Sequence, residues 1–250
     1  CVVRQRLGYL LNTRGRSHDA LVHLQRAVEL APLCGRDADI AFVLVQMGYA
    51  HFYLRNIAKA IDMGAKALQV AKPYPGTFWH RNSLFALAEF LDLGGAHDKA
   101  RARFSDLAKI LRRSLGRLDE PTKLATARNF FMLRRYQEAH DWLYQQEPLP
   151  PAIPGALYSC WRANLLLACR VGIKDIQGAK AAFAALKAEQ AINSEAPAEM
   201  GLLSERIGEV LQEYGEAEFA VAVYRYARER YIEAGWSDHA DGLSARMNGA

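Results

Sequence analysis

The sequence predicts an all-α fold, a right-handed superhelix (α-solenoid) of about six antiparallel helix-turn-helix repeats. Three observations predict it. Strong helix formers, chiefly Ala, Leu, Arg and Glu, fill long stretches with helical apolar periodicity. Small and large apolar residues recur about every 40 positions, and a fixed period of this kind is typical of repeat architectures. Glycine and proline fall between those stretches, where they end helices instead of interrupting them.

Composition limits the class of protein. The chain has 250 residues, 51% of them hydrophobic and 24% charged, which is enough apolar material for a substantial core. The net charge of +5 arises from 32 basic and 27 acidic residues that are interleaved along the chain. Because nucleic-acid binders concentrate basic charge on one face, this pattern indicates no direct binding of nucleic acid by this segment.

Cysteine spacing and the length of apolar runs indicate the cellular compartment. The four cysteines include no C-x-x-C pair, which is typical of reduced, cytoplasmic proteins and predicts no metal site. The longest apolar runs, such as Ile40 to Val45, are far shorter than the roughly 18 residues of a membrane span, so no membrane contact is expected. No signal peptide is recognisable. The chain opens at Cys1 inside an apolar-periodic stretch, so we expect a piece of a longer protein.

Six repeats are predicted in order along a single solenoid domain, residues 1–250. Their approximate bounds are 1–34, 41–74, 81–114, 120–147, 158–190 and 201–234. The first helix of a repeat carries a small residue that lets a neighbouring helix approach closely, at Gly8, Gly48, Ala88 and Gly208. The second helix carries another, at Ala20, Ala60, Ala100, Ala139 and Ala220. The fifth repeat is the weakest copy, and the regularity of its hairpin is left open.

Turn residues separate the two helices within a repeat. Gly15, Gly95 and Gly215 mark the turns of the first, third and sixth repeats. Ser17 is placed to cap the second helix of the first repeat, since a serine hydroxyl can accept from a free backbone N–H there.

Two segments depart from the repeating pattern. A proline-rich break at 148–155 removes backbone donors, and we expect a long connection between repeats there in preference to a domain boundary. Residues 235–250 are predicted to form a C-terminal capping helix, with Leu243 and Met247 covering the core of the last repeat.

The residues Leu7-Gly8, Ala20, Ala27 and Pro32 resemble the hallmark of the tetratricopeptide repeat, which runs Leu-Gly, Ala, aromatic, Ala, Pro. The resemblance covers nearly the whole chain. The first helices of the first three repeats lack the usual tryptophan, and the period is about 40 residues where roughly 34 is usual. The longer period is similar to that of the superhelical repeats of bacterial signal-responsive transcriptional regulators. This resemblance implies a protein or peptide partner in a concave groove.

No catalytic signature is present, so we expect no enzyme and no cofactor. The sequence has no phosphate-binding loop, no dinucleotide fingerprint, no nucleophile elbow and no zinc-protease motif. The seven histidines include no pair at convincing ligand spacing, and His97 is expected to cap or cover the start of a second helix. Cys169 lies on a repeat helix, where an inert core thiol is the commoner role.

Function is therefore expected on the surface, in the groove that the first helices line. Aromatic rings supply pockets for side chains, amides hold a peptide backbone and arginines receive an acidic group. The predicted groove residues are Gln5, Tyr9, Asn12, Phe42, Gln46, Tyr49, Phe52, Tyr53, Asn82, Glu89, Arg128 and Arg162. Each aromatic ring taken alone fits packing between repeats as well as it fits binding. Gln5 and Tyr9 stand where chaperone-tail adaptors of the resembled family carry a Lys and Asn clamp, so that role is not expected.

The leading hypothesis is a ligand- or protein-binding superhelix that forms the sensor or regulatory segment of a larger bacterial signalling or transcription-regulating protein. It would bind a peptide, a protein or a small-molecule signal in its groove and shift the activity of an attached output domain. The alternative is a structural adaptor that mediates assembly or self-association, and the oligomeric state is left open. An enzyme scaffolded by the repeats is the weaker rival, because it needs a buried polar cluster for which the sequence has no motif.

Overall fold

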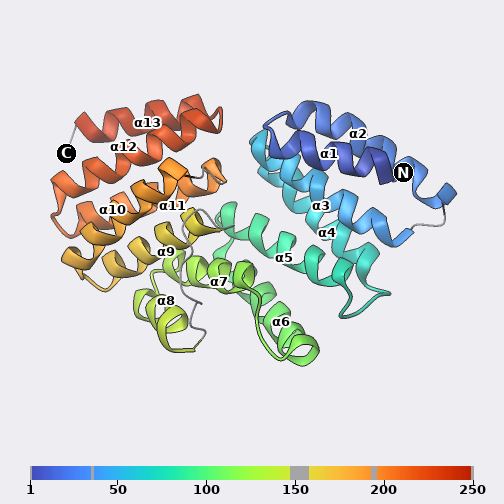
Figure 1. Ribbon diagram of the computed structural model, residues 1–250, viewed down its shortest axis with the longest axis horizontal. Coiled ribbons are helices and arrows are strands. Elements are labelled where there is room, and N and C mark those ends of the chain that lie inside the picture. The colour runs from blue at the N-terminus through green and yellow to red at the C-terminus, as the bar shows by residue number, and fades with distance from the viewer. Residues whose placement is uncertain (1, 35–36, 147–157, 193–195, 249–250) are drawn as a thin grey trace. The chain divides into compact units, whose positions relative to one another are not determined.

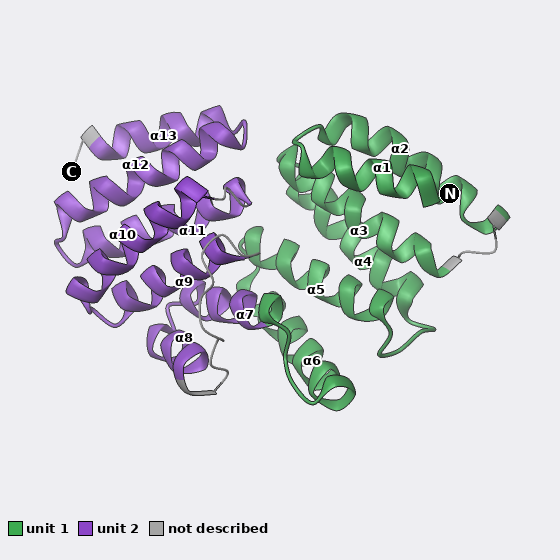
Figure 2. Cartoon of the chain, viewed as in Figure 1, with its two compact units in different colours: residues 1–122 green, residues 123–250 purple. Residues whose placement is uncertain are grey.

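The computed structural model describes residues 2–34, 37–146, 158–192 and 196–248, and these residues are predominantly helical (Figure 1). They divide into two compact units, unit 1 (residues 1–122) and unit 2 (residues 123–250) (Figure 2). No strand occurs in the described ranges, so the predicted all-α class is confirmed. The proline-rich break at 148–155 lies outside the described residues.

Unit 1 is built from three helical hairpins. Its helices are α1 (Val2–Thr13), α2 (Ser17–Leu30), α3 (Asp37–Tyr53), α4 (Ile57–Ala71), α5 (Phe78–Leu93) and α6 (His97–Leu115), with a short 3-10 helix η1 (Pro32–Cys34) after α2. Within each hairpin the two helices pack on each other, and α2 packs on α3 as α4 packs on α5. The first helices also touch one another, α1 on α3 and α3 on α5.

Unit 2 holds most of α7 and the helices that follow. Its elements are α7 (Glu120–Met132), α8 (Tyr136–Asp141), the π-helical segment η2 (Trp142–Gln146), α9 (Ser159–Gly172), α10 (Ile176–Ile192), α11 (Pro197–Glu213), α12 (Ala217–Glu233) and α13 (Ser237–Asn248). The pairs α9/α10 and α11/α12 form hairpins, and α9 also packs on α11. The last helix, α13, packs on α12, in the segment where a capping helix was predicted.

The same hydrogen-bonded turn closes each hairpin. In unit 1 the Asn56 N–H donates to the His51 carbonyl at 2.7 Å and the Ala96 N–H donates to the Leu91 carbonyl at 2.8 Å, a bond that spans five residues. This is the Schellman pattern, in which the residue before the donor adopts the left-handed conformation. That residue is Gly95 in one turn, with φ of +82°, and Arg55 in the other, with φ of +64°. Only the glycine turns carried a sequence signal.

The turn also explains why Ser17 does not cap α2. The turn after α1 ends at Arg16, and α2 begins at the next residue. Arg16 therefore occupies the N-cap position of α2. Its N–H donates to the Leu11 carbonyl at 2.9 Å, and no side-chain cap bond forms. Ser17 is the first residue of α2, and its hydroxyl is buried without a partner among the described residues. The predicted cap is therefore wrong by one position.

Small residues allow close helix contacts where the repeat pattern placed them. A Cβ added at Gly48 would lie 2.4 Å from Cε2 of Phe90 on α5. A Cβ added at Gly208 would lie 2.4 Å from Cε1 of Tyr224 on α12. Real side chains do not approach so closely, so both glycines hold space for a neighbouring ring.

Adjacent hairpins of unit 1 share one core. Leu24 and Ala27 of α2 pack with Val43 and Met47 of α3 in one buried cluster, and Leu11 of α1 belongs to it. The first hairpin therefore buries its apolar face against the second, as a stacked repeat requires.

His51 of α3 is a half-buried histidine that is expected to make stability depend on pH. It stands where the first and third hairpins carry Leu11 and Leu91, and its Nδ1 is buried without a partner among the described residues. Burial, assisted by the charge of Lys59, lowers the pKa of His51 below its ordinary value near 6.5. The unfolded chain therefore binds a proton more readily than the folded chain, and stability should fall as the pH drops through 6.5.

We expect His51→Leu to remove that part of the pH dependence and to raise stability at pH 5 more than at pH 7.5. Urea denaturation at both pH values measures the effect. His18→Gln is the control, since His18 is exposed at the start of α2. Equal stability changes at the two pH values for His51→Leu would contradict the assignment.

Candidate functional site

The centre of the predicted groove in unit 1 is a hydrogen-bonded pair on neighbouring first helices. The Tyr49 hydroxyl of α3 donates to Glu89 Oε2 of α5 at 2.6 Å, and the Glu89 side chain is buried. The Tyr49 ring meets Phe90 edge to face, with 4.9 Å between centroids, and stacks near Tyr53 at 6.5 Å. Since α3 and α5 pack on each other, the pair fixes the Tyr49 ring while leaving it half-buried.

Two predicted amides lie between α1 and α3 and do not line an open surface. The Asn12 side-chain nitrogen donates to the Gln46 backbone carbonyl at 2.8 Å. Both side chains are buried. This bond ties the first helix of one hairpin to the first helix of the next, so Asn12 and Gln46 hold α1 and α3 together.

The other predicted residues of unit 1 differ in exposure. Tyr9 is exposed, and the side chains of Gln5, Tyr53, Phe42 and Asn82 are half-buried. Phe42 packs against Phe78 with 6.0 Å between ring centroids. The Asn82 amide nitrogen is covered and has no hydrogen-bond partner among the described residues. Phe52 is completely buried, so it belongs to the core and offers no accessible ring.

A second polar cluster of unit 1 joins α5 to α6. The buried Asp92 carboxylate lies 3.0 Å from His97 Nδ1, which is the first residue of α6. His97 thus bonds to a side chain of the preceding helix, a more specific role than the capping or surface role expected for it.

The two predicted arginines of unit 2 are buried. The guanidinium of Arg128 on α7 lies 5.5 Å from the centroid of the Trp161 ring on α9, and its side chain is 2% exposed. Arg162 on α9 is also buried. A buried guanidinium needs compensating partners within the fold, so a structural role accounts for both residues.

An ion network links α11 to α13. Arg246 of α13 lies 2.7 Å from Glu209 and 3.4 Å from Glu205, both on α11. The hydrogen bond that Arg246 donates to Glu209 raises the pKa of the guanidinium. Arg206 also donates to Glu209, at 2.6 Å. These carboxylates are engaged by the protein's own cations and do not form an open acidic surface.

Two further kinds of reactive centre could lie within the described ranges, a nucleophilic thiol and a metal site. Burial raises the pKa of the Cys169 thiol to about 12, which keeps it protonated and poorly nucleophilic at neutral pH. Within those ranges no group of three or more His, Cys, Asp or Glu side chains is arranged to hold a metal ion. None of the described helices combines the length and the apolarity needed to cross a membrane.

Comparison with known proteins gives a match at the level of fold. No protein-family model matches the chain, and no curated protein matches it significantly. The Rap protein complexed with competence and sporulation factor aligns with a TM-score of 0.59 and 14% identity, over 97% of this chain and 74% of that one. A kinesin light chain from Podosopora anserina with nearly identical TPR-like repeats aligns with a TM-score of 0.57 and 14% identity. The match covers 78% of this chain and 96% of that one. BtubC from P. vanneervenii aligns with a TM-score of 0.51 and 16% identity, over 98% of this chain and 93% of that one.

The chain has a tetratricopeptide-type helical-repeat fold. In this tetratricopeptide-type array, polar pairs that link one first helix to the next recur 40 residues apart. Besides Tyr49 and Glu89, the Ser204 hydroxyl of α11 lies 3.2 Å from Asn164 Oδ1 of α9. Asn164 and Ser204 are both buried, and the sequence prediction missed them. The signal was present, because both polar residues interrupt apolar positions at the repeat spacing.

Proposed function

We propose that the protein is a ligand- or protein-binding module that holds a peptide, or an extended segment of a partner protein, along the first helices of unit 1. The observation that carries this proposal is the Tyr49–Glu89 pair, a half-buried ring held by a buried carboxylate. Tyr9, 40 residues before Tyr49, and Tyr53, one turn after it, extend the aromatic surface along α1 and α3.

Fixed tyrosine rings favour recognition of a flexible ligand. Tyrosine supplies a large contact area at a low cost in side-chain entropy, and residues of this kind dominate binding energy at many interfaces. The bond to Glu89 reduces that cost further, because the ring of Tyr49 is already oriented before a ligand arrives.

Regulation by a bound factor is the finer part of the proposal. The Rap protein, which shares this fold over 97% of the chain, was solved with competence and sporulation factor. By analogy, a peptide or a small-molecule signal held by the array would change how neighbouring repeats pack, because each repeat contacts only its neighbours. Such a change would serve a larger bacterial signalling or transcription-regulating protein.

Peptides selected from a phage-displayed random library against the whole chain test the groove. We expect Tyr49→Ala to weaken the selected peptides by about tenfold or more, as the loss of a central aromatic contact does. Tyr49→Phe keeps the ring but removes its bond to Glu89, so it should show a smaller loss. Tyr74→Ala is the matched control, because Tyr74 is an exposed tyrosine of unit 1 in the connection after α4.

Peptides that bind Tyr9→Ala and Tyr49→Ala as tightly as the parent chain would overturn the proposal. Self-association of the parent chain in sedimentation experiments, together with that result, would instead favour an assembly scaffold. Helical circular dichroism of each variant confirms that the fold is retained.

A further inference from the structure

The basic charge of the chain is concentrated on α6 and the turn that follows it. Residues 97–117 include seven basic and two acidic residues, so their net charge of +5 equals that of the whole chain. The equivalent segments of the two preceding hairpins, 57–77 and 17–37, have net charges of +2 and −1. The excess therefore belongs to the third hairpin alone and is not a property of the repeat.

The helix α6 is also one turn longer than its counterparts. It has 19 residues, whereas α2 has 14 and α4 has 15, and a proline stands two residues after the end of each shorter helix. Ala71, the last residue of α4, corresponds to Leu111, so residues 112–115 form an additional turn of α6. Gly116 ends this turn in the left-handed conformation, with φ of +70°.

The additional turn is largely uncovered. Leu115 lies four residues after Leu111 and continues the apolar stripe of α6, yet it is 53% exposed whereas Leu111 is 1% exposed. Arg113 and Arg117 are exposed as well. Five consecutive residues thus present one accessible apolar side chain and two accessible guanidinium groups.

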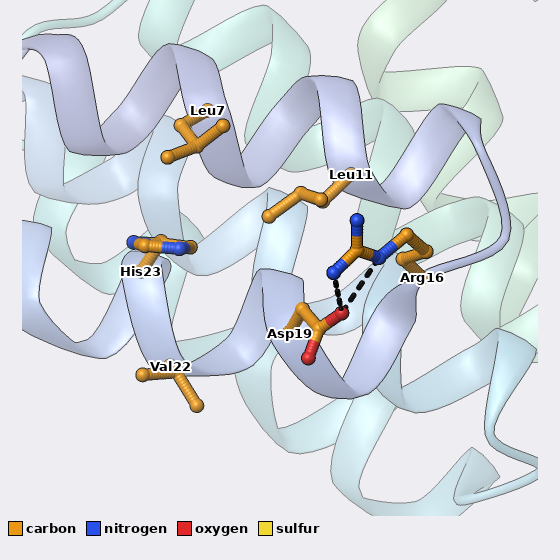
Figure 3. Close-up of a pocket in the computed structure, with 6 residues that line it drawn as sticks. All are labelled: Leu7, Leu11, Arg16, Asp19, Val22 and His23. Carbon is orange, nitrogen blue, oxygen red and sulfur yellow. Dashed lines mark hydrogen bonds and ion pairs between the residues drawn. The ribbon is translucent and has the colours of Figure 1, made fainter.

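Other cations of unit 1 are paired with a carboxylate close by in the sequence. Arg16 lies 2.6 Å from Asp19 at the start of α2 (Figure 3), and α4 has a lysine–aspartate pair at 2.7 Å. By contrast, Arg113 and Arg117 make no hydrogen bond or ion pair through their side chains with any described residue. Their charges are therefore available to a partner.

The fold itself does not account for this cluster of cations. Lys109 and Arg113 lie four residues apart, and like charges at this spacing repel each other on a helix surface. Asp106, 3.5 Å from Lys109, offsets part of the repulsion. The negative end of the helix dipole also stabilises cations, but it is equivalent to only about half an elementary charge. Arg112 and Arg113, in the last turn, already exceed that charge.

The chemistry of this surface favours an acidic protein segment over a nucleic acid. Residues 105–117 contain no aromatic ring, whereas proteins that bind single strands stack bases on such rings. Leu115 offers an apolar contact that a phosphate backbone cannot use. Carboxylates on every fourth residue of a helix, or every second residue of an extended chain, lie about 6–7 Å apart, which matches the rise from Lys109 to Arg113. Guanidinium groups bind carboxylates through paired hydrogen bonds.

We propose that the end of α6, formed by Lys109, Arg113, Leu115 and Arg117, docks an acidic segment of a partner protein. Carboxylates of the segment pair with the cations, and one of its apolar side chains contacts Leu115. This surface lies on a second helix of unit 1 and is separate from the first-helix surface around Tyr49, so either proposal can fail without the other.

A labelled peptide tests the proposal on the whole chain. The probe is a short fluorescein-labelled peptide with Glu at every second position and one central Leu, and the matched probe carries Gln in place of each Glu. We expect fluorescence anisotropy to show binding of the Glu probe that added salt weakens. Arg113→Glu should reduce the affinity about tenfold or more, and Leu115→Ser about threefold. Arg14→Glu changes the net charge equally at an exposed position after α1, and it should alter the affinity by less than about twofold.

Circular dichroism shows whether each variant keeps its helices, and Arg117→Glu repeats the charge reversal outside the helix should Arg113→Glu disturb the end of α6. Equal losses of affinity for these variants and for Arg14→Glu would exclude a site at the end of α6. Equal binding of the Gln probe would exclude recognition of carboxylates. Tighter binding of oligothymidylate, or of phosphatidylserine vesicles, that Arg113→Glu abolishes would assign the surface to a nucleic acid or a lipid surface and overturn the acidic partner.

Discussion

Replacing Phe90 with alanine is expected to destabilise unit 1 by about 3–5 kcal/mol, the range for truncating a buried aromatic ring. Phe90 is fully buried on α5, and its ring lies against Tyr49 and beside the Cα of Gly48. The substitution should therefore lower the stability of two hairpins, α3–α4 and α5–α6. Urea denaturation combined with amide hydrogen exchange in α3 and α5 measures it, because repeat proteins need not unfold in one step. Unchanged exchange in α3 would contradict the expectation.

The same ring makes Gly48 sensitive to a single methyl group. Gly48→Ala should cost about 1–3 kcal/mol through overpacking, although alanine in a helix interior gains roughly 1 kcal/mol over glycine. In the Phe90→Ala background the clash is absent, so the same change should become neutral or stabilising. Gly242→Ala in α13 is the control, since a Cβ there meets nothing within 4 Å. Equal effects at positions 48 and 242 would show that the ring yields without cost.

Tyr231→Ala is expected to destabilise the α11–α12 hairpin and the adjoining α13 by about 3–5 kcal/mol. The Tyr231 ring is fully buried, and it stacks on Trp236 with centroids 6.0 Å apart and planes 14° apart. Its hydroxyl donates to Glu205 at 2.5 Å, and burial raises the pKa of the phenol, so the donor keeps its proton over the accessible pH range. Hydrogen exchange in α13 reports the loss.

Two companion substitutions separate ring from hydroxyl. Tyr231→Phe keeps the ring and removes the donor to Glu205, so it should cost about 1–2 kcal/mol. Ile232→Ala changes the neighbouring residue, which is half-exposed, and should cost roughly 0.5 kcal/mol or less. An effect of Tyr231→Ala no larger than that of Ile232→Ala would refute the role of the ring.

The helical hairpins were predictable because their signals are local. Helix formers, apolar periodicity and the glycine turns after Leu11, Leu91 and Leu211 depend on neighbouring residues alone. The turn at Arg55 had no such signal, because the backbone there takes the left-handed conformation without a glycine. Ser17 was misassigned because a turn this tight leaves no separate residue to act as a cap.

The groove was less predictable, since it depends on how far neighbours cover each first helix. Position along a helix gives the direction of a side chain but not the size of the groups that meet it. Phe52 and Arg128 therefore turned out to be buried, whereas Tyr9 and Tyr49 retain exposed surface. Burial of the Glu89 carboxylate by its tyrosine partner is likewise a tertiary property with no local signature.

The spacing of the polar pairs has an evolutionary corollary. The Tyr49 hydroxyl donates to Glu89, and Trp79 Nε1 donates to Asp39 Oδ1 at 3.3 Å. In each pair the two residues are 40 positions apart in the sequence. Excision of one 40-residue cassette, 41–80, would bring Tyr9 opposite Glu89, in the place that Tyr49 holds now. A gene encoding such modules can therefore lose this unit by an in-frame deletion and re-form the tyrosine–glutamate bond at the new junction. The length of the array can thus change while this contact between neighbouring first helices is kept.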